Sequence, residues 1–203
     1  MKIGVPSEIK AQESRVGLTP LSVQELTNHG HEVLIQDNAG FGAGFENEDY
    51  QNAGASIAPT AGDIFNDSDM IVKVKEPQSE EVSMLRENQL LFTYLHLSAA
   101  PELTKGLVES KSICIAYETV TDENNRLPLL APMSAVAGRM SIQAGAHSLE
   151  KPQGGRGLLI GGAPGVNPGN VLILGGGVVG ENAATIATGM EAKVHIVDKS
   201  EAR

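Results

Sequence analysis

Apolar runs of strand length alternate with segments of helical period along the first part of the chain. The runs of strand length are Lys2–Val5, Glu32–Gln36, Ala55–Ala58, Asp69–Val74, Gln89–Leu95 and Ser112–Tyr117. Helices are predicted between them, the first from the Thr19-Pro20 cap to a stop at Gly30, and others at Asn47–Ala53, Ser79–Glu87 and Pro101–Ser110. Strand, helix and strand recur roughly every 20 to 30 residues, which is typical of βαβ units. Because near-continuous apolar strands indicate a parallel sheet covered on both faces, residues 1–130 are predicted to form one α/β domain.

The pattern changes beyond this domain. Residues 121–132 are polar and contain prolines, as expected where the chain crosses into a second unit. Ser134 opens a run of small residues that would let a helix approach its neighbour closely, and Lys151–Asn170 is so rich in glycine and proline that we predict a loop. A strand, a helix and a strand are then predicted at Val171–Leu174, Gly180–Met190 and Ala192–Asp198.

Residues 131–203 therefore contain only the first βαβ unit of a doubly wound nucleotide-binding domain, which needs about six strands. We expect this chain to be the N-terminal part of a longer protein, or one piece of a cleaved one. The predicted fold class is α/β, with a flavodoxin-like or Rossmann-like domain followed by the first βαβ unit of a Rossmann domain.

The composition is acidic, with 25 Asp and Glu against 15 Lys and Arg and a formal net charge of −10. Such a surface repels polyanions, so we expect neither nucleic acid nor an anionic membrane as a partner. No stretch is apolar over the roughly 18 residues of a membrane span, and the N-terminus lacks the apolar core of a signal peptide. The one cysteine, Cys114, excludes an intrachain disulfide and a CxxC-type metal site. We expect a cytoplasmic protein with no bound metal.

The glycines of the second unit form a dinucleotide fingerprint. Gly175, Gly177 and Gly180 supply GxGxxG directly after an apolar strand and at the head of a helix. The first glycine permits a tight turn, the second lets the backbone approach a pyrophosphate, and the third lets the helix pack on the strand. Asp198 ends a second strand about 20 residues further on, where an acid hydrogen-bonds a ribose 2′-hydroxyl and favours NAD over NADP. The alternative is a glycine-rich turn beside a solvated aspartate.

Polar side chains follow three strands of the predicted sheet. Arg15 lies in the loop after the first strand, where a guanidinium can hold a carboxylate in bidentate fashion. Lys73 and Lys75 flank Val74 at a strand end, and alternation would put both lysines on one face. His96 ends the next strand, and histidine exchanges protons near pH 7.

Each of these residues taken singly is more often a structural or solvated group. Together they follow parallel strands, so their loops should open at one edge of the sheet. An anion clamp, an ammonium and an acid/base group beside a nicotinamide would suit oxidation of a small amino or hydroxy acid.

Longer motifs, in order from residue 1 to the end, resemble the bacterial alanine dehydrogenase family. They are KIGVPSEIKAQESRVGLTP, VKVKEP, LLFTYLHLSA, APMSAVAGRMSIQAGAHSLE and GGAPGVNPGNVLILGGGVVGENAA. Motifs of this length are far more specific than a glycine fingerprint. The resemblance implies reversible, NAD-dependent deamination of L-alanine to pyruvate and ammonia, by a two-domain subunit that usually forms hexamers.

By this resemblance residues 1–130 are the substrate-binding domain. Arg15 would bind the substrate carboxylate and Lys75 the keto oxygen, and His96 would be the catalytic residue that exchanges a proton as a carbinolamine forms and collapses. The cofactor contacts that the resemblance and the glycine fingerprint imply are Ser134, Gly175, Gly177, Val178, Val179, Gly180, Asp198 and Arg203.

The chain also departs from the family. The second catalytic residue of the family, an aspartate, lies beyond position 203, and Ala135 stands where an acidic residue is expected in APMSxVAGRM. We therefore expect a full-length parent to be active and the 203 residues alone to be inactive. Two alternatives stay open: the NAD-binding subunit of a proton-translocating transhydrogenase, which needs no amino-acid pocket, and a non-catalytic truncated α/β module.

Overall fold

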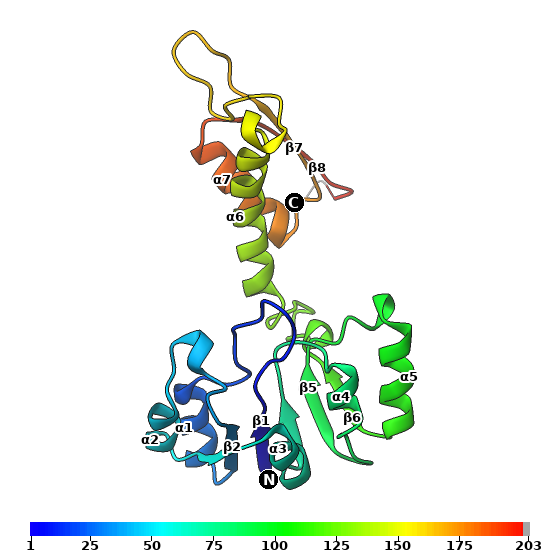
Figure 1. The fold of residues 1–203 in the computed structure, drawn as a ribbon. Helices are drawn as coiled ribbons and strands as arrows, with labels where there is room; N and C mark the ends of the chain where they lie inside the picture. The colour runs from blue at the N-terminus through cyan, green and yellow to red at the C-terminus, as the bar shows by residue number, and fades with distance from the viewer. Residues whose placement is uncertain (201–203) are drawn as a thin grey trace. The chain divides into compact units, whose positions relative to one another are not determined.

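The computed structural model describes residues 1–200. The chain divides into two compact units, and the boundary between them falls between Val120 and Thr121. The first unit is a sheet of six parallel strands (Figure 1). Its strands are β1 (Lys2–Val5), β2 (Glu32–Gln36), β3 (Ser56–Ala58), β4 (Met70–Val72), β5 (Leu90–Thr93) and β6 (Ile113–Ala116), in the spatial order β3-β2-β1-β4-β5-β6. This is the doubly wound order, and it confirms the predicted α/β class with a parallel sheet.

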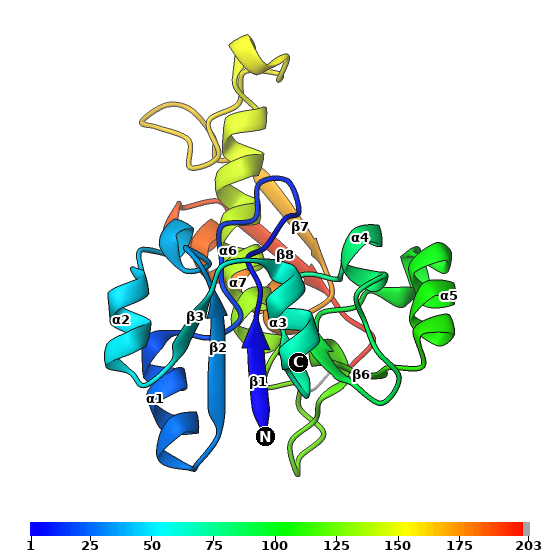
Figure 2. The same cartoon turned by 60° about the horizontal axis from the view of Figure 1, so that its bottom comes forward.

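Helices cover both faces of this sheet, as predicted. They are α1 (Pro20–Asn28), α2 (Asn47–Asn52), α3 (Ala61–Asp67), α4 (Ser79–Val82) and α5 (Pro101–Ser110). One core cluster joins α1 and α2 to Ile3, Val33 and Val72 of the strands, and the other joins α3, α4 and α5 to Ile71 and Leu91. Adjacent residues such as Ile71 and Val72 belong to different clusters because successive strand side chains point to opposite faces. In Figure 2, α3 lies in front of the sheet near β1.

Several elements of the first unit differ from the sequence prediction, and helix α4 ends at Val82 instead of the predicted Glu87. The short helix α3 was not predicted, although Thr60 and Asp63 form a capping box at its start, with each side chain bonded to the backbone N–H of the other residue. Strand β4 is shorter than the predicted Asp69–Val74 and ends at Val72. Beyond it, the N–H groups of Val74 and Lys75 donate to the Glu8 carboxylate rather than to a neighbouring strand.

The second unit contains a helix and one βαβ unit. Helix α6 (Ala131–Ser148) packs on α7 (Val178–Gly189), which connects the parallel strands β7 (Asn170–Leu174) and β8 (Lys193–Val197). The predicted strand–helix–strand order is confirmed, with α7 starting two residues before the predicted Gly180. A Cβ on Gly138 of α6 would lie 2.2 Å from the carbonyl oxygen of Val179, so the small residue does permit the close helix approach.

Short single-turn helices complete the described chain: η1 (Phe41–Ala43), η2 (Leu97–Ala99), η3 (Tyr117–Thr119) and η4 (Lys151–Gln153). Residues 154–169 otherwise form the predicted loop. Over residues 1–200, no helix is both long and apolar enough to span a membrane.

Candidate functional site

The strand order of the first unit places a topological switch point at the carboxyl edge of its sheet, where we expect a crevice. The chain runs outward from β1 through β2 and β3 and then returns to β4 on the other side of β1, so the loops after β1 and β4 diverge from a topological switch point. Open α/β sheets bind their ligands at such a point. Arg15 lies in the loop after β1, Lys75 in the loop after β4 and His96 in the loop after β5. Because all three strands are parallel, the three loops leave the same edge of the sheet.

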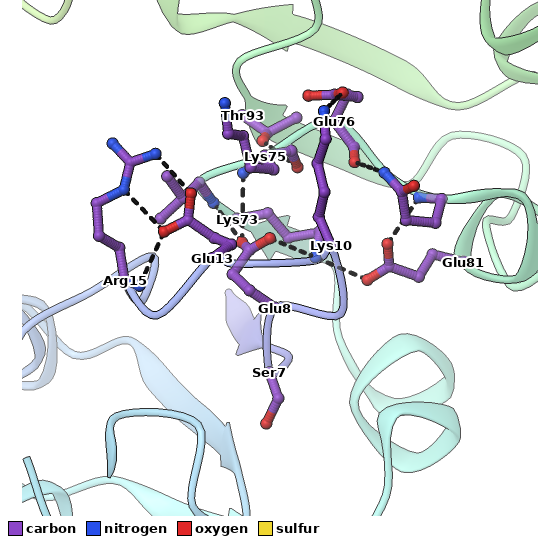
Figure 3. A network of polar contacts seen from close by, with 12 residues as sticks. Ser7, Glu8, Lys10, Glu13, Arg15, Lys73, Lys75, Glu76, Glu81 and Thr93 are labelled. Carbon is purple, nitrogen blue, oxygen red and sulfur yellow. Dashed lines mark hydrogen bonds and ion pairs between the residues drawn. The ribbon is translucent and has the colours of Figure 1, made fainter. Parts of the chain in front are cut away.

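Arg15 is held by Glu13 in the same loop (Figure 3). The guanidinium donates from Nε to Glu13 Oε1 over 2.8 Å and from Nη2 to Oε2 over 2.6 Å, and the Arg15 backbone N–H also donates to Oε1. These hydrogen bonds, with the charges of Arg15 and Lys75, outweigh partial burial and lower the pKa of Glu13 to about 2. The result is an oriented cation at the crevice, with Lys75 close enough to act on the same carboxylate.

Tyr94 connects Arg15 with His96. Its ring stacks on the His96 imidazole with 6.0 Å between ring centroids and 10° between ring planes. Burial raises the pKa of the Tyr94 hydroxyl, and the positive charge of Arg15 opposes that rise. Tyr94 was not among the predicted site residues. Its place two positions before His96, in the same apolar run of the sequence, was the available signal.

His96 occupies a turn rather than the strand end that was predicted. Strand β5 ends at Thr93, and His96 is the N-cap residue of η2, in the left-handed conformation with φ 50° and ψ 38°. The carboxylate of Glu118 in η3 supports this turn, since its Oε1 accepts the N–H of His96 over 2.7 Å and that of Leu95 over 3.1 Å. Burial alone would raise the pKa of Glu118, but these backbone hydrogen bonds and the nearby His96 hold it below its ordinary value.

The expectation that Lys73 and Lys75 share one strand face is wrong, because β4 ends before either residue. Lys73 turns inward and is completely buried, with its Nζ 2.7 Å from Glu81 Oε1 and 3.3 Å from Glu8 Oε2. Lys75 is half-buried, and its backbone oxygen accepts a hydrogen bond from Thr93 Oγ1 over 2.9 Å. Its charge lowers the pKa values of Glu13 and Glu76. Lys75 therefore supplies an ammonium group to the crevice, whereas Lys73 belongs to the interior.

The glycine turn of the second unit has the predicted conformation. Gly175 has φ +102°, which side-chain-bearing residues rarely adopt, and a Cβ on Gly180 would lie 1.8 Å from the Gly175 oxygen. Gly177 is the N-cap of α7, so the first N–H groups of that helix follow directly. Asp198 Oδ2 accepts the N–H of Gly176 over 2.6 Å, which ties the acid after β8 to the turn after β7.

One cleft within the second unit is lined by seven of the predicted cofactor contacts, namely Ser134, Gly175, Gly177, Val178, Val179, Gly180 and Asp198. The eighth, Arg203, lies outside the described residues. A left-handed glycine, a helix N-terminus and a carboxylate at the end of the second strand fit the pyrophosphate and ribose of a dinucleotide. Over residues 1–200, no group of three or more His, Cys, Asp or Glu side chains is arranged to hold a metal ion.

The doubly wound sheet and the glycine turn on a βαβ unit define a Rossmann-like α/β protein with two candidate ligand sites. The family described as alanine dehydrogenase/PNT, N-terminal domain, matches residues 4–137, and its C-terminal domain matches residues 141–203. The chain belongs to the alanine dehydrogenase/PNT family.

Relatives and solved structures agree with this assignment. The chain is 57% identical over 200 residues to an alanine dehydrogenase from Halomonas elongata, and 54% identical over 198 residues to one from Bacillus subtilis. These alignments cover 98% of this chain but 54% and 52% of the relatives, so the chain spans about half their length. A solved L-alanine dehydrogenase superimposes with a TM-score of 0.88 at 56% identity, covering 98% of this chain and 55% of the other. A transhydrogenase from Sinorhizobium meliloti, with a TM-score of 0.79 at 23% identity and coverage of 100% and 57%, shares the fold.

Proposed function

We propose that this chain carries the substrate site and the glycine turn of the cofactor site of an NAD-dependent alanine dehydrogenase, which interconverts L-alanine with pyruvate and ammonia. The observation that carries the proposal is the arrangement at the carboxyl edge of the first sheet. Arg15, Lys75 and His96 follow three parallel strands there. Glu13 accepts hydrogen bonds from Arg15 and is affected by the charge of Lys75. Tyr94 stacks on His96 and is affected by the charge of Arg15. The names of the relatives support the choice of alanine as substrate.

Each of the three side chains has a role that its chemistry suits. The Arg15 guanidinium binds the carboxylate shared by alanine and pyruvate, since a planar fork of N–H donors matches two carboxylate oxygens. Lys75 donates a hydrogen bond to the keto oxygen of pyruvate and stabilises the negative charge that develops there when ammonia adds to the neighbouring carbon. His96 gives a proton to that oxygen as it leaves as water, and takes a proton in the reverse direction.

The second unit is proposed to hold NAD. Gly175 and Gly180 allow the close turn, the N-terminus of α7 faces the pyrophosphate, and Asp198 accepts hydrogen bonds from the adenosine ribose. When bound, the dinucleotide supplies the hydride acceptor for oxidation of alanine. Ser134, Val178, Val179 and Arg203 remain proposed contacts. A cytoplasmic location and assembly into hexamers complete the proposal and rest on the family resemblance.

The test is NADH consumption by the complete gene product with pyruvate and ammonium. We expect turnover, a fall in kcat of about 10² to 10⁴-fold for His96→Ala, and a raised KM for pyruvate in Arg15→Ala. His29→Ala is the matched control, because this exposed histidine after α1 pairs with Glu25 of the preceding helix and lies outside the proposed site. Absence of turnover in the unmodified protein would refute the proposal, and turnover by isolated residues 1–203 would refute the expectation that they are inactive.

A further inference from the structure

A buried group of three charged side chains lies beyond the carboxyl ends of β1 and β4 and has no role in the proposed chemistry. It consists of Glu8 from the loop after β1, Lys73 from the loop after β4, and Glu81 from α4 (Figure 3). The side chain of Lys73 is 0% exposed and those of both glutamates are 2% exposed. Charged side chains are rarely buried so fully unless they are paired, and a pair of this kind often fixes a conformation rather than adding stability.

The two carboxylates of this group hold different parts of the backbone. Glu8 Oε1 accepts the N–H of Val74 over 2.7 Å and the N–H of Lys75 over 3.3 Å, while its Oε2 faces Lys73. Glu81 instead accepts the N–H of Gln78 over 2.8 Å and caps its own helix α4. Burial raises the pKa of Glu81, which Lys73 opposes. Of these two glutamates, Glu8 is therefore the one that bonds to the backbone N–H of Lys75.

Glu8 lies beside the topological switch point of the sheet, between β1 and β4. It belongs to the same loop as Arg15, and the residues that it holds belong to the loop of Lys75 on the other side of the switch point. Strand β4 ends at Val72, so the ladder of the sheet does not fix the next residues towards β1. The Glu8 carboxylate binds the N–H groups of Val74 and Lys75 instead, and the buried ammonium group of Lys73 balances the negative charge of Glu8.

From these contacts we infer that Glu8 is a positioning residue for the proposed reaction, which fixes Lys75 relative to Arg15 by binding the N–H groups of Val74 and Lys75. This inference rests on the proposed function and extends it. Misplacement of a catalytic or binding group by about 1 Å can cost on the order of 100-fold in rate, so anchoring of this backbone is worth a measurable factor.

The experiment compares Glu8→Gln with Glu81→Gln in the complete gene product. Each substitution removes one buried carboxylate partner of the same lysine, so Glu81→Gln controls for the loss of a charged partner of Lys73. Glu8→Gln leaves one amide to serve both Lys73 and the two N–H groups, which its single oxygen cannot do. Glu81→Gln leaves the contacts of Val74 and Lys75 untouched.

For Glu8→Gln we expect kcat/KM for pyruvate to fall at least about tenfold further than in Glu81→Gln. The KM for NADH should stay unchanged in both variants, and amide hydrogen exchange of residues 74–75 should accelerate only in Glu8→Gln. Glu8→Asp keeps the charge that Lys73 needs but withdraws the carboxylate by one methylene, so it tests the same loss if Glu8→Gln does not fold.

Equal losses in Glu8→Gln and Glu81→Gln, with unchanged exchange at residues 74–75, would overturn the inference while leaving the proposed function intact. No turnover in the unmodified protein would instead overturn the proposed function. The exchange rates then still decide whether Glu8 anchors Val74 and Lys75.

Discussion

Replacing Glu13 with glutamine removes the carboxylate that orients Arg15 but keeps the shape of the side chain. In the structure this carboxylate accepts three hydrogen bonds from Arg15, at 2.6, 2.8 and 2.9 Å. Its pKa falls from the ordinary 4.5 to about 2, because the ionised form is the one that Arg15 binds. A group whose pKa is lower in the folded state stabilises the fold above its unfolded pKa, and this contribution disappears as the pH falls through the folded pKa.

The size of this contribution follows from the shift. One pKa unit corresponds to about 1.36 kcal/mol, so the fall from 4.5 to about 2 would equal about 3 kcal/mol in a fully shielded pair. The Arg15 side chain is 47% exposed, and screening by water reduces the value to about 1 kcal/mol. We expect Glu13→Gln to lower the free energy of unfolding by that amount at pH 7. The difference from the wild type should shrink as the pH falls from 4.5 towards 2.

Urea unfolding of the 203-residue chain, followed by tyrosine fluorescence, measures this difference selectively. The chain has three tyrosines and no tryptophan, and Tyr50, Tyr94 and Tyr117 all lie in the first unit. Glu109→Gln is the control, because its pair with Lys105 spans 3.9 Å between side chains that are 67% and 69% exposed and contributes less than about 0.5 kcal/mol. A destabilisation of Glu13→Gln that is the same at pH 7 and near pH 2 would refute the reasoning.

Three further substitutions test other parts of the account. Glu118→Gln weakens the acceptor of the His96 N–H and should lower kcat about tenfold, with little change in the KM for NADH. An unchanged kcat would show that the turn at His96 needs no carboxylate. Asp198→Ala should weaken NADH binding and reduce discrimination against NADPH in a fluorescence titration, and equal affinities before and after would count against the ribose contact. Gly180→Ala places a methyl group 1.8 Å from the Gly175 oxygen and should cost about 1 to 3 kcal/mol in thermal unfolding, whereas Gly189→Ala, with no atom within 4 Å, should cost nothing.

The parallel sheet was predictable from the chain because its strands are apolar almost without interruption. Strand β2 (Glu32–Gln36) has the same bounds in the structure as in the prediction, and so does helix α5 (Pro101–Ser110). The glycine turn was predictable for a similar reason: Gly175 and Gly180 follow from backbone geometry that is local in sequence. The parallel order then brings the loops of Arg15, Lys75 and His96 to one edge without further information.

Two supporting residues, Glu8 and Glu118, were not predictable, because their partners are distant in sequence. Glu8 meets Lys73 across 65 positions, and Glu118 meets His96 across 22. Alternation along a strand assigned Lys73 to the same face as Lys75, and this rule failed where β4 stopped and a buried carboxylate took over the backbone N–H groups. Tertiary contacts of this kind override local pattern, and they determine how the site is held rather than where it is.

The central claim is that Arg15, Lys75 and His96 form one site for a small keto acid. A crystal structure of the complete gene product with bound pyruvate tests it most directly. The account predicts the pyruvate carboxylate on the Arg15 guanidinium, the keto oxygen within hydrogen-bond distance of Lys75 Nζ, and the His96 imidazole beside that oxygen. Pyruvate bound away from the carboxyl edge of the six-stranded sheet, with these three side chains not in contact with it, would contradict the account.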